Sequence, residues 1–169
     1  SADQLTAAEI VNGWSEEKLA GMFKNYGEER YSRRIAKEIV LRRKSKKILT
    51  TIELAEIVSK AIHGAGSGKI HPATRVFQAL RIAVNDELQA LDEGLSEAWR
   101  ILATGGRMVV ISFHSLEDRI VKNFFRNKKS DGLAEILTKK PLRPTDDEMK
   151  NNPRSRSAKL RAIIKLKNA

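Results

Sequence analysis

Cysteine is absent from this chain of 169 residues. Its absence excludes disulfide bonds, thiolate metal sites and cysteine nucleophiles. No apolar run approaches the roughly 20 residues that cross a bilayer, and the amino terminus carries no signal-peptide pattern. With 41% hydrophobic and 31% charged residues, the composition predicts one domain or two small ones in the cytoplasm, and not a membrane protein.

Acidic residues are scarce in two segments. The formal net charge is +11, and the excess is local. Residues 30–47 hold nine Lys or Arg and one acid, and residues 151–169 hold six and no acid. This pattern favours an anionic partner, above all nucleic acid, although two solvated faces would look the same. A membrane surface is less favoured, because no basic helix has Trp or Phe on an apolar face.

Strand patterns are missing before residue 107. The first 63 residues show helical periodicity, with capping boxes at Thr6 and Thr50 and a cap at Ser15. We predict an α-helical subdomain at residues 1–66 and an α/β part at 67–169. The glycine-rich residues 64–68 are interpreted as a linker, because a cofactor loop must follow a strand and open a helix.

The second part alternates between helical and strand patterns. Pro72 suits the start of a long helix that packs on a sheet, and residues 107–112 read as a buried strand. A helix follows, then a short strand within residues 133–142. Residues 160–167 alternate as a half-buried strand, with basic side chains mostly on the second face. Both tryptophans, Trp14 and Trp99, are predicted to lie in the core.

A polar cluster follows the strand at residues 107–112. Ser112, Phe113 and His114 stand where ligands bind in open α/β sheets, beyond the carboxyl end of a strand. We predict that Ser115 caps the next helix, with Asp118 at capping-box spacing. Acids in a first helical turn mostly stabilise the helix dipole, so Glu117 and Asp118 are weaker candidates for contact with substrate.

Four segments, residues 26–30, 71–88, 112–119 and 152–157, resemble the bacterial methyltransferases that modify a cytosine at N4 in ribosomal small-subunit RNA. The resemblance implies a mostly helical α/β fold: the later strands of a Rossmann-like class I methyltransferase sheet, with an α-helical insertion subdomain. It also implies S-adenosylmethionine as methyl donor, without a metal, and the 16S RNA of the small ribosomal subunit as substrate. The amino-terminal half that holds the main donor site has no match here. We therefore predict no cofactor-binding residue in this chain and no activity of the chain alone.

The resemblance also selects site residues. The predicted pocket residues are Ser112, Phe113 and His114, and the predicted RNA-binding residues are His71, Arg75, Arg119, Arg154 and Arg156. Each has a rival role in capping, in the core or in a solvated loop. With the preceding strands missing, the strand at 107–112 should keep an unsatisfied edge, which favours self-association.

Two other functions remain open on charge alone. The chain fits a non-catalytic basic module that binds RNA, or a helical protein that binds acidic protein surfaces. The segment Ser112 to Arg119 favours the methyltransferase, because neither alternative requires such a cluster at a strand end.

Overall fold

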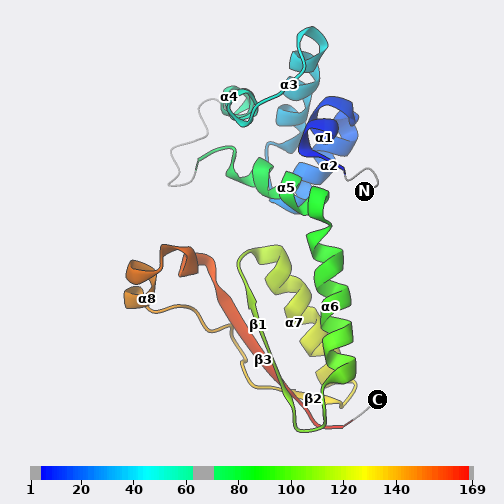
Figure 1. Cartoon of the computed structure of the whole chain (residues 1–169), viewed down its shortest axis with the longest axis vertical. Helices are drawn as coiled ribbons and strands as arrows, with labels where there is room; N and C mark the ends of the chain where they lie inside the picture. Colours follow the sequence, from blue (N-terminus) through cyan, green and yellow to red (C-terminus); the bar gives the residue numbers. More distant parts are fainter. Residues whose placement is uncertain (1–4, 63–70, 168–169) are drawn as a thin grey trace. The chain divides into compact units, whose positions relative to one another are not determined.

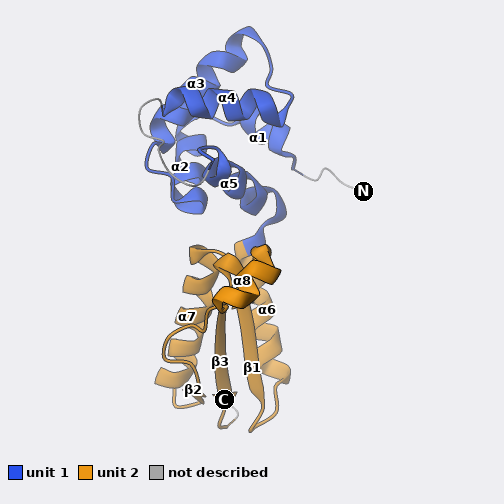
Figure 2. Cartoon of the chain, turned by 90° about the vertical axis from the view of Figure 1, so that its left-hand side faces the viewer, with its two compact units in different colours: residues 1–87 blue, residues 88–169 orange. Residues whose placement is uncertain are grey.

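The structure is a computed structural model that describes residues 5–62 and 71–167. The chain divides into two compact units, residues 1–87 and residues 88–169, drawn in blue and orange in Figure 2. The division predicted at residues 66–67 lies outside the described residues and stays a prediction, as does the interpretation of residues 64–68 as a linker.

Unit 1 is helical throughout its described part, as predicted (Figure 1). Its helices are α1 (Ala7–Gly13), α2 (Glu16–Gly27), α3 (Ser32–Ser45), α4 (Thr51–Ala61) and α5 (Thr74–Asn85). Each helix contributes apolar side chains to one core, and the fully buried members include Ile10, Leu19, Phe23, Ile35, Ile39, Val58 and Val76. Trp14 packs against this core only partly buried.

The predicted helix starts in unit 1 are confirmed with one exception. Thr6 and Thr50 form complete capping boxes with Glu9 and Glu53, and the Ser15 side chain accepts from the Lys18 backbone. The exception is α3, because the helical periodicity of residues 28–43 predicts that it begins at Glu28. It begins at Ser32 because Glu28 adopts a left-handed conformation, with φ 49°, that ends α2.

The long helix expected from Pro72, with a break near Gly94 or an end at Thr104, is two helices, and Gly94 lies inside the second. Asp86, with φ 49°, breaks it between α5 and α6 (Glu87–Ile101). Helix α5 packs against α2 in unit 1 and not on a sheet. The periodicity was continuous because an apolar stripe has the same spacing whichever surface it covers.

Gly27 lets α2 approach α5. A Cβ atom at this position would lie 2.5 Å from the backbone oxygen of Arg75. We expect Gly27→Ala to lower the free energy of unfolding by about 1–3 kcal/mol, the usual cost of overpacking. Gly21→Ala is the matched control in the same helix, because nothing lies within 4 Å of a Cβ there. The control should raise stability by about 0.5–1 kcal/mol. Urea titrations of both variants would contradict us if Gly27→Ala were neutral.

Unit 2 is a small antiparallel sheet with two helices on one face. Its strands are β1 (Arg107–Ser112), β2 (Ala134–Ile136) and β3 (Lys159–Lys165), in the spatial order β1-β3-β2. Figures 1 and 2 both place α6 and α7 (Ser115–Ser130) on the same side of this sheet. The short helix α8 (Asp146–Asn151) and the 3₁₀ helix η1 (Pro153–Ser157) precede β3. Trp99 of α6 is buried between these layers, as predicted.

The face of the sheet that the helices cover is the opposite of the one that the alternation in β3 suggests. The alternation itself is confirmed, but the covered face carries Arg161, Ile163 and Lys165, all buried. The Lys165 ammonium group donates to the backbone oxygens of Trp99 (3.1 Å) and Leu102 (2.7 Å) at the end of α6. A buried lysine is tolerated here because it meets carbonyls that the helix end leaves without intrahelical partners.

The other face of the sheet is apolar and open. Val109 and Ile111 of β1 are more than half exposed, at 56% and 55%. Among the described residues, β1 pairs along one edge only, with β3. An open apolar face and a strand edge are both features that promote association. No described helix is long and apolar enough to cross a membrane.

Candidate functional site at the end of β1

The predicted pocket residues occupy the turn from β1 into α7. Ser112 is buried, and its hydroxyl donates to the Lys159 backbone oxygen over 3.4 Å. Phe113, the next residue, is 53% exposed. Alternation along the strand explains the contrast, because neighbouring residues point to opposite faces of the sheet. Of the two side chains, only Phe113 presents a large surface to a ligand.

His114, and not Ser115, caps helix α7. Its Nδ1 accepts a hydrogen bond from the Glu117 backbone over 3.3 Å, and Glu117 Oε2 accepts from the His114 backbone over 3.1 Å. The same oxygen accepts from the Phe113 backbone over 2.8 Å. The predicted Ser115–Asp118 capping box is therefore wrong by one residue. The rival role of His114 at the helix entry is the one observed, because an imidazole nitrogen can accept the same hydrogen bond as a hydroxyl cap.

The cap also orients the imidazole ring. Because Nδ1 accepts, the neutral ring carries its proton on Nε2, an assignment inferred from the bonding pattern. Nε2 lies 3.4 Å from Glu117 Oε1, and the side chain is 10% exposed. The Glu117 carboxylate thus accepts from the His114 backbone and also lies beside the imidazole ring. The ring cannot turn without breaking the cap.

Asp118 anchors α7 to β3. Its carboxylate accepts two hydrogen bonds from the Arg161 guanidinium, over 2.7 and 3.2 Å, and lies 3.5 Å from the Lys159 ammonium group. The hydrogen bonds from Arg161 hold the pKa of Asp118 below its ordinary value, against the opposing effect of burial. In its carboxylate form, Asp118 therefore holds the start of α7 against the sheet.

Three of the predicted RNA-binding arginines belong to elements at this same end of unit 2. Arg119 is exposed in the first turn of α7, and Arg154 and Arg156 are exposed in η1. Helix η1 leads into β3, whose Lys159 pairs in register with Ser112 at the end of β1. Figure 2 shows α8 at this end of the sheet. The strand end is thus bordered by exposed cations.

The other two predicted RNA-binding residues lie in unit 1. Nδ1 of His71 accepts from the Ala73 backbone over 3.2 Å, so His71 supports the turn before α5. Arg75 is half exposed, and its guanidinium lies 4.0 Å from the buried Glu29 carboxylate. Gln78 also donates to the Tyr26 backbone oxygen over 3.1 Å. Residues 26–30 and the start of α5 therefore pack together. They belong to two of the four segments that carry the family resemblance.

A family model described as the MraW methylase family matches residues 1–166. The chain belongs to this family. It is 55% identical over 162 residues to the ribosomal RNA small subunit methyltransferase H of Sulfurihydrogenibium sp. (strain YO3AOP1), a match that covers 95% of this chain and 55% of that protein. The protein of the same name from Nostoc sp. (strain PCC 7120 / SAG 25.82 / UTEX 2576) is also 55% identical, over 95% of this chain and 52% of its own length.

Other relatives agree in name and in coverage. The ribosomal RNA small subunit methyltransferase H of Carboxydothermus hydrogenoformans is 48% identical over 176 residues, covering 95% of this chain and 57% of that protein. The chain spans about half the length of the curated relatives it matches. The predicted resemblance to rRNA-modifying methyltransferases is therefore confirmed at the level of the family.

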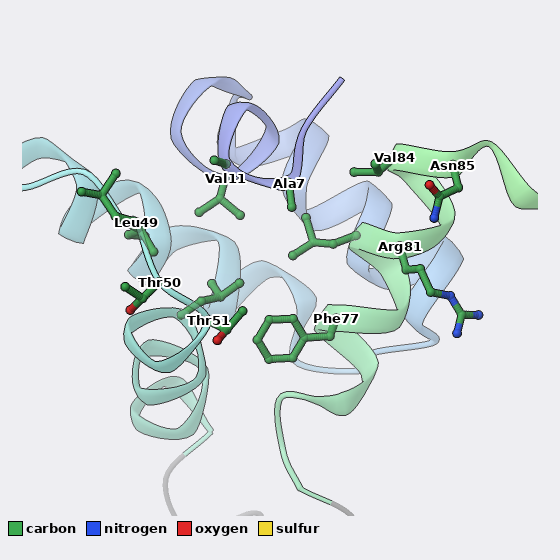
Figure 3. A pocket seen from close by; sticks show the side chains of 13 residues that line it. Ala7, Val11, Leu49, Thr50, Thr51, Phe77, Arg81, Val84 and Asn85 are labelled. Carbon is green, nitrogen blue, oxygen red and sulfur yellow. The ribbon is translucent and has the colours of Figure 1, made fainter. Parts of the chain in front are cut away.

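An apolar cavity in unit 1 is lined partly by α5, which lies within the segment 71–88 that carries the family resemblance. It has a volume of about 350 Å³ and lies among α1, the start of α4 and α5. Figure 3 shows Val11 and Phe77 pointing into it, while the Arg81 guanidinium points away. Its lining contains no carboxylate. An acidic side chain is the usual partner of ribose hydroxyls in nucleotide sites, so this cavity does not resemble one.

Sequence reasoning missed the basic residues that support the strand end in this member of the MraW methylase family. Lys159 and Arg161 are the partners of Asp118, and both had been counted with a basic face of β3. The signal was present, since Ile163 shares their face in the alternation. A face with a fully buried Ile163 must be covered, so its cations need partners.

Proposed function

We propose that the whole protein transfers a methyl group from S-adenosylmethionine to N4 of a cytidine in 16S ribosomal RNA. This chain would supply the later strands of a Rossmann-like methyltransferase sheet and an inserted helical subdomain. The observation that carries the proposal is the family match over residues 1–166, together with relatives named for methylation of small-subunit ribosomal RNA. Such a substrate places the activity in the cytoplasm.

The strand end of unit 2 is suited to hold the base. The cytosine amine is a weak nucleophile, because its lone pair is conjugated with the ring, so catalysis requires alignment with the methyl group and acceptors for its hydrogens. When bound, the donor provides an electrophilic methyl group on sulfur. The exposed ring of Phe113 offers a stacking surface for an unstacked base. His114, held in one orientation by Glu117, would shape the pocket beside it, while the buried Ser112 supports the turn.

The exposed arginines would hold the RNA backbone around that pocket. Arg119, Arg154 and Arg156 border the strand end, and Arg75 with His71 offers a second contact in unit 1. Guanidinium groups bind phosphate with paired hydrogen bonds, which suits this role. The half-exposed guanidinium of Arg75 shares its interactions with Glu29, so its contribution should be the smaller one.

The main donor site is proposed to lie in the part of the relatives that this chain does not cover. We expect the isolated chain to show no appreciable binding of S-adenosylmethionine, because no described strand leads into a glycine loop followed by a ribose-binding acid. Calorimetric titration of the chain with the donor measures this. Stoichiometric binding at low micromolar concentration would contradict the prediction and direct attention to residues 64–68.

The role of His114 can be separated from its cap in a complete enzyme that contains this chain. We expect His114→Asn, which retains a good capping side chain, to lower single-turnover methylation at least about tenfold, equivalent to about 1.4 kcal/mol in the transition state. Its melting temperature and its affinity for the donor should stay near those of the parent. His114→Ala should show the same loss of rate and also lose about 1 kcal/mol of stability, because the cap is gone. A parent-like rate in His114→Asn would reduce His114 to a cap.

A non-catalytic module that binds RNA is the second candidate function. It is favoured by the net charge of +11 alone. Methylation by the complete enzyme, mapped to a cytidine of 16S RNA by mass spectrometry, distinguishes the two. Binding of RNA without methyl transfer would support the module. Self-association of the isolated chain through β1 is proposed for either function, because its edge and apolar face are open.

A further inference from the structure

Helix α3 carries a basic ridge along one side. The ridge consists of five exposed residues: Arg33, Arg34, Lys37, Leu41 and Lys44. At 3.6 residues per turn these positions fall within an arc of about 100°. From residue 33 to residue 44 the ridge runs about 16 Å, at 1.5 Å per residue. The opposite side of α3 is buried in the core of unit 1 through Ile35, Ala36 and Ile39, so the ridge is fixed in place.

The four cations of the ridge are not neutralised within the described part of the chain. No described carboxylate lies within 4.0 Å of any of them. Neighbouring cations are used differently: Arg43 donates to the Val11 backbone oxygen over 2.8 Å, and Lys46 pairs with Glu53 over 2.9 Å. The ridge thus concentrates positive charge that the fold does not use.

The start of the ridge also disfavours the helix. Arg33 and Arg34 stand in the first turn, where cations oppose the helix dipole, and that turn has no acidic residue. The preceding Tyr31 makes no side-chain capping hydrogen bond. Helices α1, α2 and α4 of the same unit have a capped start and acidic residues in the first turn, whereas α5, like α3, has neither. Helix stability therefore does not explain the two arginines, whereas an external anion does.

We propose that the ridge on α3 binds the sugar-phosphate backbone of a base-paired segment of the RNA substrate without reading its sequence. The inference rests on the proposed RNA substrate. The ridge has no aromatic side chain, so it offers no platform for the stacking that proteins use on single strands. Recognition of paired RNA relies on shape and on backbone contacts, which a straight row of cations can supply. A membrane is disfavoured because the apolar side of α3 is buried, and Leu41 is the one large apolar side chain of this helix that is exposed.

The test compares two triple variants with the same change in charge. Arg33, Lys37 and Lys44 are replaced by Gln in the ridge variant, and the exposed Lys18, Lys24 and Lys60 of the same unit are replaced by Gln in the control. The probes are an RNA hairpin with a 20-base-pair stem and a single-stranded RNA of equal length, titrated by fluorescence anisotropy from 50 to 200 mM KCl. Circular dichroism melts check that both variants are folded, as expected for exposed positions.

For the hairpin, the ridge variant should lower the slope of log K against log salt by about 2, since each lost phosphate contact removes about 0.7–0.9. This electrostatic contribution vanishes near 1 M salt, so the affinity at 0.1 M should fall by roughly 100-fold. The control should lose far less. Equal losses of affinity in the two variants would contradict a specific role of the ridge and indicate only a general effect of net charge.

Two further results would also overturn the inference. A ridge variant that loses affinity only for the single-stranded RNA contradicts a paired segment. Tighter binding of the parent chain to polyglutamate or to anionic vesicles than to the hairpin would point to an acidic protein or a membrane. If the parent chain binds neither RNA, the RNA-binding part of the proposed function fails with it. If the parent binds the hairpin and the ridge variant is unaffected, only the inference about α3 fails.

Discussion

Raising the salt concentration from 50 to 200 mM should weaken RNA binding by this chain by about three orders of magnitude or more, if six to eight phosphates are contacted. The reason is counterion release. Each neutralised phosphate frees a condensed cation, and the entropy gained by releasing it decreases as the salt concentration rises. The contacts would come from the two basic segments, residues 30–47 and 151–169. Equilibrium binding of a labelled 16S RNA fragment across this range measures the effect.

The structure is consistent with that number of contacts. Of the fifteen cations in the two segments, six are engaged with the fold: Arg30, Arg43, Lys46, Lys159, Arg161 and Lys165. Nine remain for phosphate, enough for six to eight contacts. Circular dichroism at both salt concentrations is the control against unfolding. An affinity that stays flat would rule out an electrostatic interface.

Replacing Asp118 with Ala should lower the free energy of unfolding by about 3 kcal/mol, because it leaves the buried Arg161 guanidinium without its carboxylate. Asp118→Leu combined with Arg161→Leu is the matched control, since replacing both partners with apolar side chains removes the unpaired charge. The double variant should recover most of the loss. Urea titration measures all three proteins. A loss below about 1 kcal/mol in Asp118→Ala would show that the pair contributes little, as exposed pairs do.

The same pair predicts a dependence of stability on pH. Arg161 lowers the pKa of Asp118 in the folded chain, so the unfolded chain takes up a proton first as the pH falls. The stabilisation is complete above the unfolded pKa, near 4, and is lost as the pH falls through the lower folded pKa. The stability difference between the parent and Asp118→Asn should therefore shrink between about pH 5 and pH 2. A constant difference would exclude this linkage.

The sequence predicted the strand and the helix that carry the candidate site, and the errors in predicting its cap and its ion pair have a common cause. The strand at residues 107–112 and, to within one residue, the start of the helix after it were predicted correctly, because local apolar patterns encode both elements. Helix α7 continues to Ser130, beyond the end that the pattern predicts near Phe125. The statistical preference for hydroxyl caps favours Ser115 over His114, whereas the observed cap depends on the two hydrogen bonds between His114 and Glu117. Asp118 could not be assigned to Arg161, 43 residues later, from local spacing.

The sequence by itself determined the helical nature of unit 1, most helix starts, the strand positions and the resemblance to the MraW methylase family, because these features depend on neighbouring residues. Only the tertiary structure decided which face of β3 is covered, since alternation separates two faces without saying which one meets α6 and α7. Only the tertiary structure decided that α5 belongs to the helical unit. Both outcomes depend on contacts between distant segments, and a one-dimensional pattern contains the spacing of side chains but not the identity of their partners.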